Sequence, residues 1–409
     1  MSKRFVSFII AIILFLSCFA SKSAAASVFM NTTAFCVGTD FGLLDADTSA
    51  DATNAAFHYG CMGLTCNTVT IPTRVIINGT HPNGNKNMAS GIVFLSGHGN
   101  PSLMSFNYKK NGGQYHVGIT SDDDNFTGSS GCFYYTISNY QCSDTALYVF
   151  AGCQTAAGTD NLAKTAFEKG AKITIGWTVD VSYISHPTWL NRFNSALSDG
   201  LSVDEACDEA DSYSYFSNTV KHHATYGHSN HNPMDYIGVL LVSSKKRTER
   251  GTVISQNIDE KSAFALSSEY MYNLFKDHAK DFHIEETKVG QKIIWDYIYY
   301  LDSIRTSYAY TFIFDDNRLL AFDNTNGETF DSFSSKLSLI AQKTPLESID
   351  NIQVRDINSI LSECKDSIKE KKQSIYYDAL ENRIYSVTEF FAVDSDGLSY
   401  SDYLLSKIQ

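Results

Sequence analysis

The sequence lacks an excess of positive charge, and it lacks the common zinc-binding motifs. It contains 32 Lys and Arg against 45 Asp and Glu, which gives a formal net charge of −13. Nucleic acids and anionic membranes are therefore not expected as partners, because this balance does not attract them. Neither a Cys-x-x-Cys pair nor a His-Glu-x-x-His segment occurs, so no zinc site and no cofactor are predicted.

Long apolar runs are scarce as well, and the one candidate for a membrane span lies at the N-terminus. Lys3 and Arg4 precede an apolar run from Phe5 to Leu16, and small residues follow at Ala24 to Ala26. This order is typical of a secretion signal, and the run is shorter than the ~20 residues of a spanning helix. We expect residues 1–26 to be cleaved, the mature protein to be secreted, and no integral membrane segment to remain. A membrane anchor is the alternative.

The chain of 409 residues is long enough for two domains. In residues 27–243, short apolar segments alternate with amphipathic ones, which favours an α/β fold with a mainly parallel sheet and helices on both faces. Segment 244–258 begins with polar and basic residues, so a linker is predicted there. Residues 259–409 show the pattern of a smaller α+β domain, in which a helix followed by strands occurs twice. We expect this domain to be a separable regulatory or substrate-docking unit that lies outside the active site.

Two further predictions concern the first domain. Tyr236–Val242 is apolar and is expected to be its last strand. Cys61 with Cys66, and Cys132 with Cys142, are close enough in sequence to form disulfides in an oxidising compartment. The pairing itself cannot be deduced from the sequence.

Two polar clusters are candidate metal sites. Asp122 to Asp124 open a loop rich in Gly and Ser, and His222, His223, His228 and His231 lie close together near the end of the first domain. We expect a solvated loop at each cluster. The alternatives are a calcium site at the aspartates and another metal at the histidines.

The strongest functional signal comes from two segments, each of which contains an apolar run that stops at a glycine. One runs from Gly91 to Asn100 and carries His98, and the other runs from Thr145 to Thr155 and carries Cys153. Both are predicted to be buried strands. Since the carboxyl ends of parallel strands share one edge of a sheet, an imidazole and a thiol are expected to meet there. A small buried Cys and a solvated His are the structural alternative.

At these residues the chain resembles a known family, the caspase-like (clan CD) cysteine peptidases, and within it CHAT domains and gingipain-like peptidases. The likeness covers about residues 88–243 and is weaker over 30–87. It rests on Leu95 to Gly99, Phe150 to Ala156, Gly158, Phe167, Gly170, Ala171, Gly176, Trp177, Val179, Asp180, Phe193, Leu197, Gly200, Ala206 and Ala210. Gly152 departs from the family, which usually has Ala before the cysteine. The C-terminal pattern is similar to the PepSY or cystatin-like modules of exported bacterial proteins.

The resemblance implies a caspase-like three-layer sandwich and endopeptidase activity on a protein or peptide substrate. Cys153 is then the nucleophile and His98 the acid/base, because an imidazole helps to form the reactive thiolate. The backbone N–H groups of Gly99 and Cys153 are the implied oxyanion donors. Asp180 and Trp177 lie where some relatives line the specificity pocket, and a carboxylate there favours Arg or Lys. The alternative for Asp180 is a capping or loop aspartate.

Two other functions remain open at this stage. A caspase-like domain without catalysis would serve as a binding module at the cell surface, although the intact pair of His98 and Cys153 argues against it. A hydrolase or transferase of another class, acting for example on a wall peptide, would use the same thiol.

Overall fold

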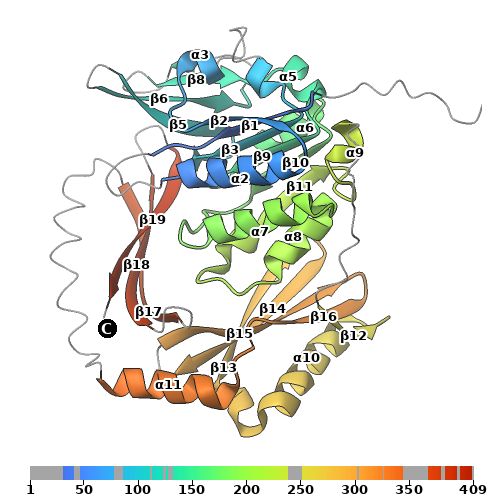
Figure 1. Cartoon of the computed structure of the whole chain (residues 1–409), viewed down its shortest axis with the longest axis vertical. Helices are drawn as coiled ribbons and strands as arrows, with labels where there is room; N and C mark the ends of the chain where they lie inside the picture. Colours follow the sequence, from blue (N-terminus) through green and yellow to red (C-terminus); the bar gives the residue numbers. More distant parts are fainter. Residues whose placement is uncertain are drawn as a thin grey trace, which may run out of the picture.

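The structure is a computed structural model of the whole chain (Figure 1). It describes residues 31–40, 47–77, 86–110, 113–122, 126–127, 132–237, 251–301, 304–325, 327–343, 367–378, 383–393 and 397–407. The predicted signal, residues 1–26, lies outside these ranges. No helix within them is both long enough and apolar enough to cross a membrane.

A six-stranded sheet forms the centre of the N-terminal half. Its strands are β1 (Thr33–Val37), β2 (Thr65–Val69), β3 (Ile92–Ser96), β9 (Leu147–Ala151), β10 (Ile173–Trp177) and β11 (His223–Gly227). They follow the order β11-β10-β9-β3-β1-β2. Every neighbouring pair is parallel except β10 with β11, which is antiparallel. The prediction of a mainly parallel sheet is therefore confirmed.

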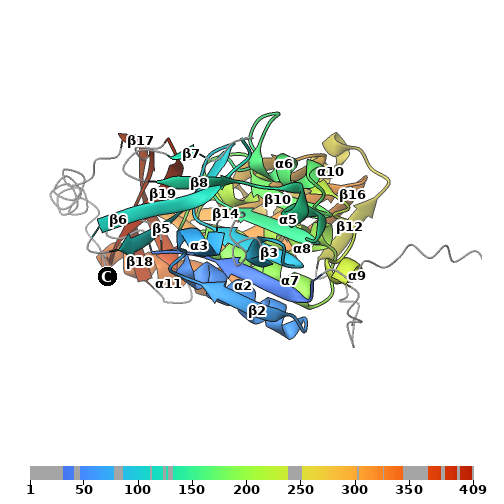
Figure 2. The same ribbon diagram turned by 90° about the horizontal axis from the view of Figure 1, so that it is seen from above.

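Helices cover this sheet on both faces. One face carries α2 (Ser49–Cys61), α7 (His186–Ser198) and α8 (Val203–Asp211), and the other carries α3 (Arg74–Ile77), α5 (Asn139–Ser143), α6 (Leu162–Glu168) and the hairpin of β5 (Leu103–Lys110) and β6 (Gly113–Thr120). The view from above shows β6 in the outer layer beside α3 (Figure 2). The result is a three-layer α/β arrangement, as expected.

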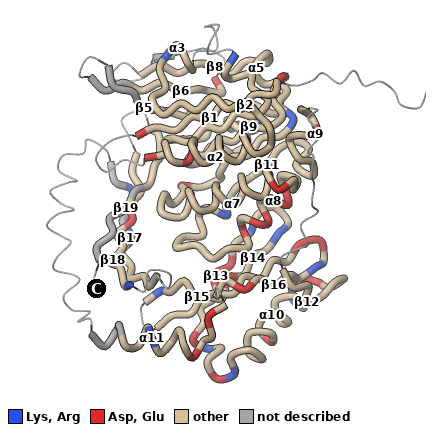
Figure 3. The backbone as a smooth tube through the Cα atoms, in the orientation of Figure 1, with Lys and Arg blue, Asp and Glu red and all other residues tan. Residues whose placement is uncertain are grey.

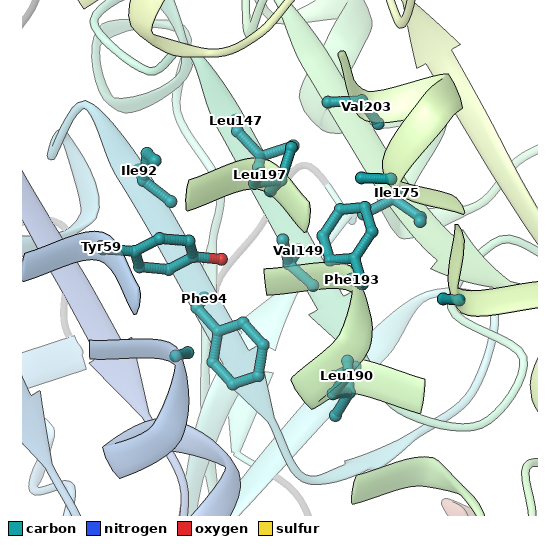
Figure 4. Close-up of a cluster of buried hydrophobic side chains, with 14 of the residues drawn as sticks. Tyr59, Ile92, Phe94, Leu147, Val149, Ile175, Leu190, Phe193, Leu197 and Val203 are labelled. Carbon is teal, nitrogen blue, oxygen red and sulfur yellow. The ribbon is translucent and has the colours of Figure 1, made fainter. Parts of the chain in front are cut away.

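The strand sequences explain why the central sheet is covered on both sides. All five residues of β3, β9 and β10 are buried, as continuous apolar runs in a doubly covered parallel sheet require. Alternate side chains point to opposite layers. Phe94 and Val149, for example, pack with Tyr59 of α2 and Phe193 of α7 (Figure 4).

Local sequence signals set the ends of several helices. At the start of α8, the Ser202 hydroxyl accepts a hydrogen bond from the Glu205 N–H, and the Glu205 carboxylate accepts one from the Ser202 N–H. This reciprocal pair is a capping box. At the end of α6, Gly170 adopts a φ of +118°, a conformation that glycine tolerates better than other residues.

The second sheet contains the strands of the C-terminal region. These are β12 (Thr252–Gln256), β13 (Phe282–Val289), β14 (Lys292–Leu301), β15 (Ile304–Asp315), β16 (Arg318–Asp323), β17 (Ser367–Asp378), β18 (Arg383–Val393) and β19 (Ser399–Lys407). The helices of this region are α10 (Glu260–Phe275), the 3-10 helix η3 (Lys276–Asp281) and α11 (Phe330–Lys343). Helix and antiparallel strands thus follow each other twice along the chain.

This second sheet does not stop at the C-terminal region. Its order is β12-β16-β15-β17-β18-β19-β4-β5-β6-β8-β7, with β14 beside β15 and β13 beside β14. The additional short strands are β4 (His98–Gly99), β7 (Phe126–Thr127) and β8 (Phe133–Thr136). Pairing of β19 with β4 joins the two halves of the chain through one sheet. Thr252–Gln256 lies in the predicted linker, yet it forms β12 and pairs with β16.

Polar contacts also connect the two halves. On the 3-10 helix η2 (Asn218–Lys221), the Lys221 ammonium lies 2.7 Å from the Asp296 carboxylate of β14, and both side chains are fully buried. Lys292 of β14 forms an ion pair with Asp208 of α8, where acidic and basic positions meet in Figure 3. The contact between the two halves therefore includes an ion pair that is removed from water.

Two predictions about the first domain are wrong within the described residues. Tyr236 belongs to the short helix α9 (Met234–Ile237), while residues 238–242 lie outside the description. The edge of the sheet beside β10 is formed by the antiparallel strand β11. The predicted disulfides are not formed either, because the thiols of Cys61, Cys66 and Cys142 are free.

Candidate active site

The register of two parallel strands brings His98 and Cys153 to one place. Ser96, the last residue of β3, pairs with Ala151, the last residue of β9. His98 and Cys153 each follow two residues later, and both line the same cavity of about 30 Å³ at this edge of the sheet. The sequence-based prediction that they share a sheet edge agrees with this arrangement.

The backbone after β3 lies directly against the backbone of the cysteine. A Cβ atom added to Gly99 would lie 2.6 Å from the Cys153 carbonyl oxygen and 3.2 Å from the Cys153 nitrogen. A Cβ atom at Gly152 would lie 2.8 Å from the Gly97 carbonyl oxygen. Glycine is therefore required at both positions, because a side chain at either one would collide with the backbone of the other strand end.

A tight turn holds Cys153 in position. Gln154 adopts a left-handed φ of +59°, which is costly for a residue with a side chain, and its N–H donates to the Val179 carbonyl at 3.0 Å. The buried Thr155 hydroxyl donates to the Phe150 carbonyl at 2.8 Å and accepts from the Trp177 N–H at 3.2 Å. The positioning role of Thr155 was not predicted from the sequence, although a polar residue beside a buried strand end was a usable signal.

The thiol of Cys153 is protonated at neutral pH in this state. Burial raises its pKa to about 12, and the negative charge of Asp180 acts in the same direction. The Val181 N–H donates to the sulfur at 3.3 Å and partly offsets these effects. Since the thiolate is the nucleophilic form, the site as seen here is not activated.

His98 is covered by a residue from the C-terminal region. The ring of Tyr400, on β19, stacks on the His98 imidazole with centroids 4.3 Å apart and an angle of 5° between the planes. Tyr400 and its neighbour Ser401 also line the cavity. The expectation that residues 259–409 lie outside the active site is therefore wrong, because long-range strand pairing brings β19 to β4.

Neither residue predicted for the specificity pocket lines the cavity. Trp177 is fully buried, and its indole N–H donates to the Val220 carbonyl at 2.7 Å, so it is a core residue. The Asp180 carboxylate accepts from the Gln154 side-chain amide at 2.6 Å and lies 3.7 Å from the Lys369 ammonium. These contacts point Asp180 toward the turn and β17, because its charge is partnered there.

The sequence did not reveal the other residues around the cavity. They include Thr48, Val181, Tyr183 and His186. Burial lowers the pKa of His186 to about 3, so this second imidazole is neutral at neutral pH. These residues come from loops and helix starts whose position depends on tertiary packing, and no local motif marks them.

Neither polar cluster provides evidence for a metal site. No group of three or more metal-binding side chains occurs within the ranges that the structure describes. His223 is not in a solvated loop as expected: it is buried in β11, and its Nε2 lies 3.0 Å from the Asp211 carboxylate. Of the three aspartates at 122–124, Asp123 and Asp124 lie outside the description.

Comparison with known proteins gives little evidence for a function. No family model matches the chain, and no curated protein matches it significantly. Among solved structures, the complex of the pro- and mature domains of Porphyromonas gingivalis RgpB is similar with a TM-score of 0.30 and 9% identity. That likeness covers 92% of this chain and 69% of the other. A TM-score at this level does not establish a common fold, so the functional argument rests on the residues of this chain.

Proposed function

We propose that this protein is an exported cysteine endopeptidase with a caspase-like catalytic region. The observation that carries the proposal is that His98 and Cys153 line one cavity. Each follows two residues after a strand end, and the two strand ends, Ser96 and Ala151, pair with each other. The N-terminal segment of residues 1–26 supports export by its sequence alone. The resemblance of the two strand-end motifs to caspase-like peptidases supports the reaction class.

The proposed reaction uses residues of this chain only. His98 takes the proton from the Cys153 thiol, and the thiolate attacks the carbonyl carbon of the peptide bond. The backbone N–H groups of Gly99 and Cys153 stabilise the oxyanion, and His98 returns the proton to the leaving amine. Water then attacks the thioester and releases the acid product, which regenerates the thiol. A preference for Arg or Lys before the cleaved bond gains no support, because Asp180 contacts Gln154 and Lys369.

One observation favours a second candidate function, a catalytically silent binding module. The Cys153 thiol is buried and has its pKa raised to about 12, which is the opposite of the depression that catalytic thiols show. The peptidase proposal requires that opening of the cavity returns water to the thiol, since burial is the main cause of the raised pKa. The binding module requires no such change.

A cleavage assay in a variant with an open site separates these candidates. Because the Tyr400 ring covers His98, we expect Tyr400→Ala to cleave members of a fluorogenic peptide panel. Adding Cys153→Ala should abolish cleavage, and adding His98→Ala should reduce it by about 10²–10⁴-fold. Cys61→Ala is the matched control, since Cys61 is an exposed thiol away from the cavity. Absence of cleavage in Tyr400→Ala, with Cys153 open to a small alkylating reagent, would favour the binding module.

A further inference from the structure

The C-terminal strand β19 covers His98 and lines the cavity that also contains Cys153. Ser399 pairs antiparallel with Gly99, which the proposal assigns to the oxyanion site. In Figure 1, β19 rises from the C-terminal strands toward the edge of the N-terminal half. A segment 300 positions later in the sequence thus pairs with the edge of β4.

Neighbouring residues of β19 contact His98 directly and Cys153 through Val181. Tyr400 is only 4% exposed and stacks on His98. The Ser401 hydroxyl donates to the Val181 carbonyl at 2.6 Å and accepts from the Tyr183 N–H at 2.7 Å. Val181 in turn donates its N–H to the Cys153 sulfur. The strand is therefore connected to the nucleophile through one residue.

Further contacts hold the strand at its start. The Asn100 side-chain amide donates to the Gly397 carbonyl at 3.4 Å. The Lys369 ammonium donates to the Ser399 hydroxyl at 2.8 Å and lies near the Asp180 carboxylate. With β19 in place, the cavity of about 30 Å³ is far smaller than the ~300 Å³ or more of ordinary ligand pockets. A peptide cannot reach the thiol in this state.

We propose that β19 occupies the place of the substrate, so that the open cleft binds an extended peptide with an aromatic side chain over His98. This proposal rests on the peptidase function proposed above and adds both its substrate class and its regulation. Once β19 has left, β4 has a free strand edge, and such edges bind extended peptides by main-chain pairing. Adjacent side-chain sites then provide selectivity. The chain's own Ser399, Tyr400 and Ser401 fill these positions until β19 is displaced.

The first test measures access to Cys153 and does not depend on catalysis. The full-length protein is treated with iodoacetamide, and alkylation at Cys153 is followed by peptide mapping with mass spectrometry. In Tyr400→Ala we expect the rate to rise by roughly 10- to 100-fold, since a stacked and buried aromatic ring stabilises closed states by factors of this size. Tyr400→Phe keeps the ring and should match the wild type.

Tyr376→Ala is the matched control on the same sheet. Tyr376 lies on β17, and its ring packs edge-on against Phe216 away from the cavity, so the Cys153 rate should not change. Ser401→Ala gives a milder variant if Tyr400→Ala fails to fold. It removes two hydrogen bonds of β19 and should raise the rate several-fold. A folded Tyr400→Ala or Ser401→Ala protein with the wild-type rate would overturn the proposal.

The second test asks whether the place that β19 occupies can bind a separate peptide, as a substrate site would. A synthetic peptide with the sequence of residues 397–403 is added to the Tyr400→Ala protein, and it should slow alkylation of Cys153 again. The same peptide with Ala at the position of Tyr400 should protect less. Equal protection by both peptides, or by neither, would refute the aromatic preference. Faster alkylation of Cys153 without cleavage of any peptide would show that β19 covers the thiol but that the protein is not a peptidase.

Discussion

At the scale of single residues, the environment of Cys153 determines what the site does in this state. Burial of the thiol and the nearby Asp180 carboxylate both oppose loss of its proton, and together they raise its pKa to about 12. The Asp180 charge is only partly compensated by Lys369 at 3.7 Å. The sequence suggested Asp180 as a contact for substrate. Its negative charge instead helps to raise the pKa of the Cys153 thiol.

The first prediction follows from that charge. Asp180→Asn keeps an oxygen for the hydrogen bond from Gln154 but removes the negative charge, so the pKa of Cys153 should fall. At pH 8, alkylation of Cys153 should become about twofold faster or more, because a larger share of the thiol is ionised. The pH dependence of the iodoacetamide rate measures the effect. Asp160→Asn, at an almost fully exposed carboxylate, should leave the rate unchanged; equal effects of the two substitutions would contradict the assignment.

At the scale of elements, the site depends on a contact between α2 and β3. Asp51 lies in the first turn of α2, and the Ser96 hydroxyl at the end of β3 donates to its carboxylate at 2.8 Å. Burial raises the pKa of Asp51 to about 7, although this hydrogen bond acts in the opposite direction. Ser96 lines the cavity, so this contact fixes the strand end that precedes His98.

The second prediction concerns the pH dependence of stability. A carboxyl with a folded pKa near 7 and an unfolded pKa near 4 binds its proton more tightly in the folded state. Its contribution to stability is complete below about pH 4 and is lost as the pH rises through about 7, on the order of 3–4 kcal/mol in all. Asp51→Asn should remove this part of the pH dependence, as measured by urea unfolding between pH 4.5 and 8. An unchanged slope in the variant would show that Asp51 ionises normally.

At the scale of the whole molecule, the two halves are joined by a shared sheet and by a buried ion pair. Lys221 and Asp296 are both fully buried, and the Thr311 hydroxyl also donates to the Asp296 carboxylate at 2.5 Å. Breaking such a pair leaves an uncompensated charge away from water. The expectation of a separable C-terminal domain did not include this contact.

The third prediction is therefore a single unfolding transition, whose free energy falls when the ion pair of Lys221 with Asp296 is broken. Lys221→Ala should lower the free energy of unfolding by about 3–5 kcal/mol, whereas Lys288→Ala, at an exposed ion pair, should not shift the urea midpoint. Tryptophan fluorescence reports both halves, because Trp177 and Trp189 lie in the first and Trp295 in the second. Two separate transitions in the wild type would restore the idea of independent domains.

The sequence by itself determined the buried parallel strands of the central sheet and the meeting of His98 with Cys153. Both follow from local signals: apolar, β-branched and aromatic runs form buried strands, and glycines end them. Parallel pairing then places the residues after each strand at the same edge. The capping box at Ser202 and Glu205 is a local signal of the same kind, since the two residues lie within one helical turn.

Only the tertiary structure decided what surrounds that pair. The pairing of Ser399 with Gly99 joins residues 300 positions apart, and a strand's hydrophobic pattern does not state which distant edge it will bind. Packing between distant segments decided three other features in the same way. These are the partners of Asp180 and Trp177, the position of β11 at the edge of the central sheet, and the burial of Lys221. Composition and periodicity describe one segment at a time, so the thiol and imidazole were visible in the sequence, but the strand that covers them was not.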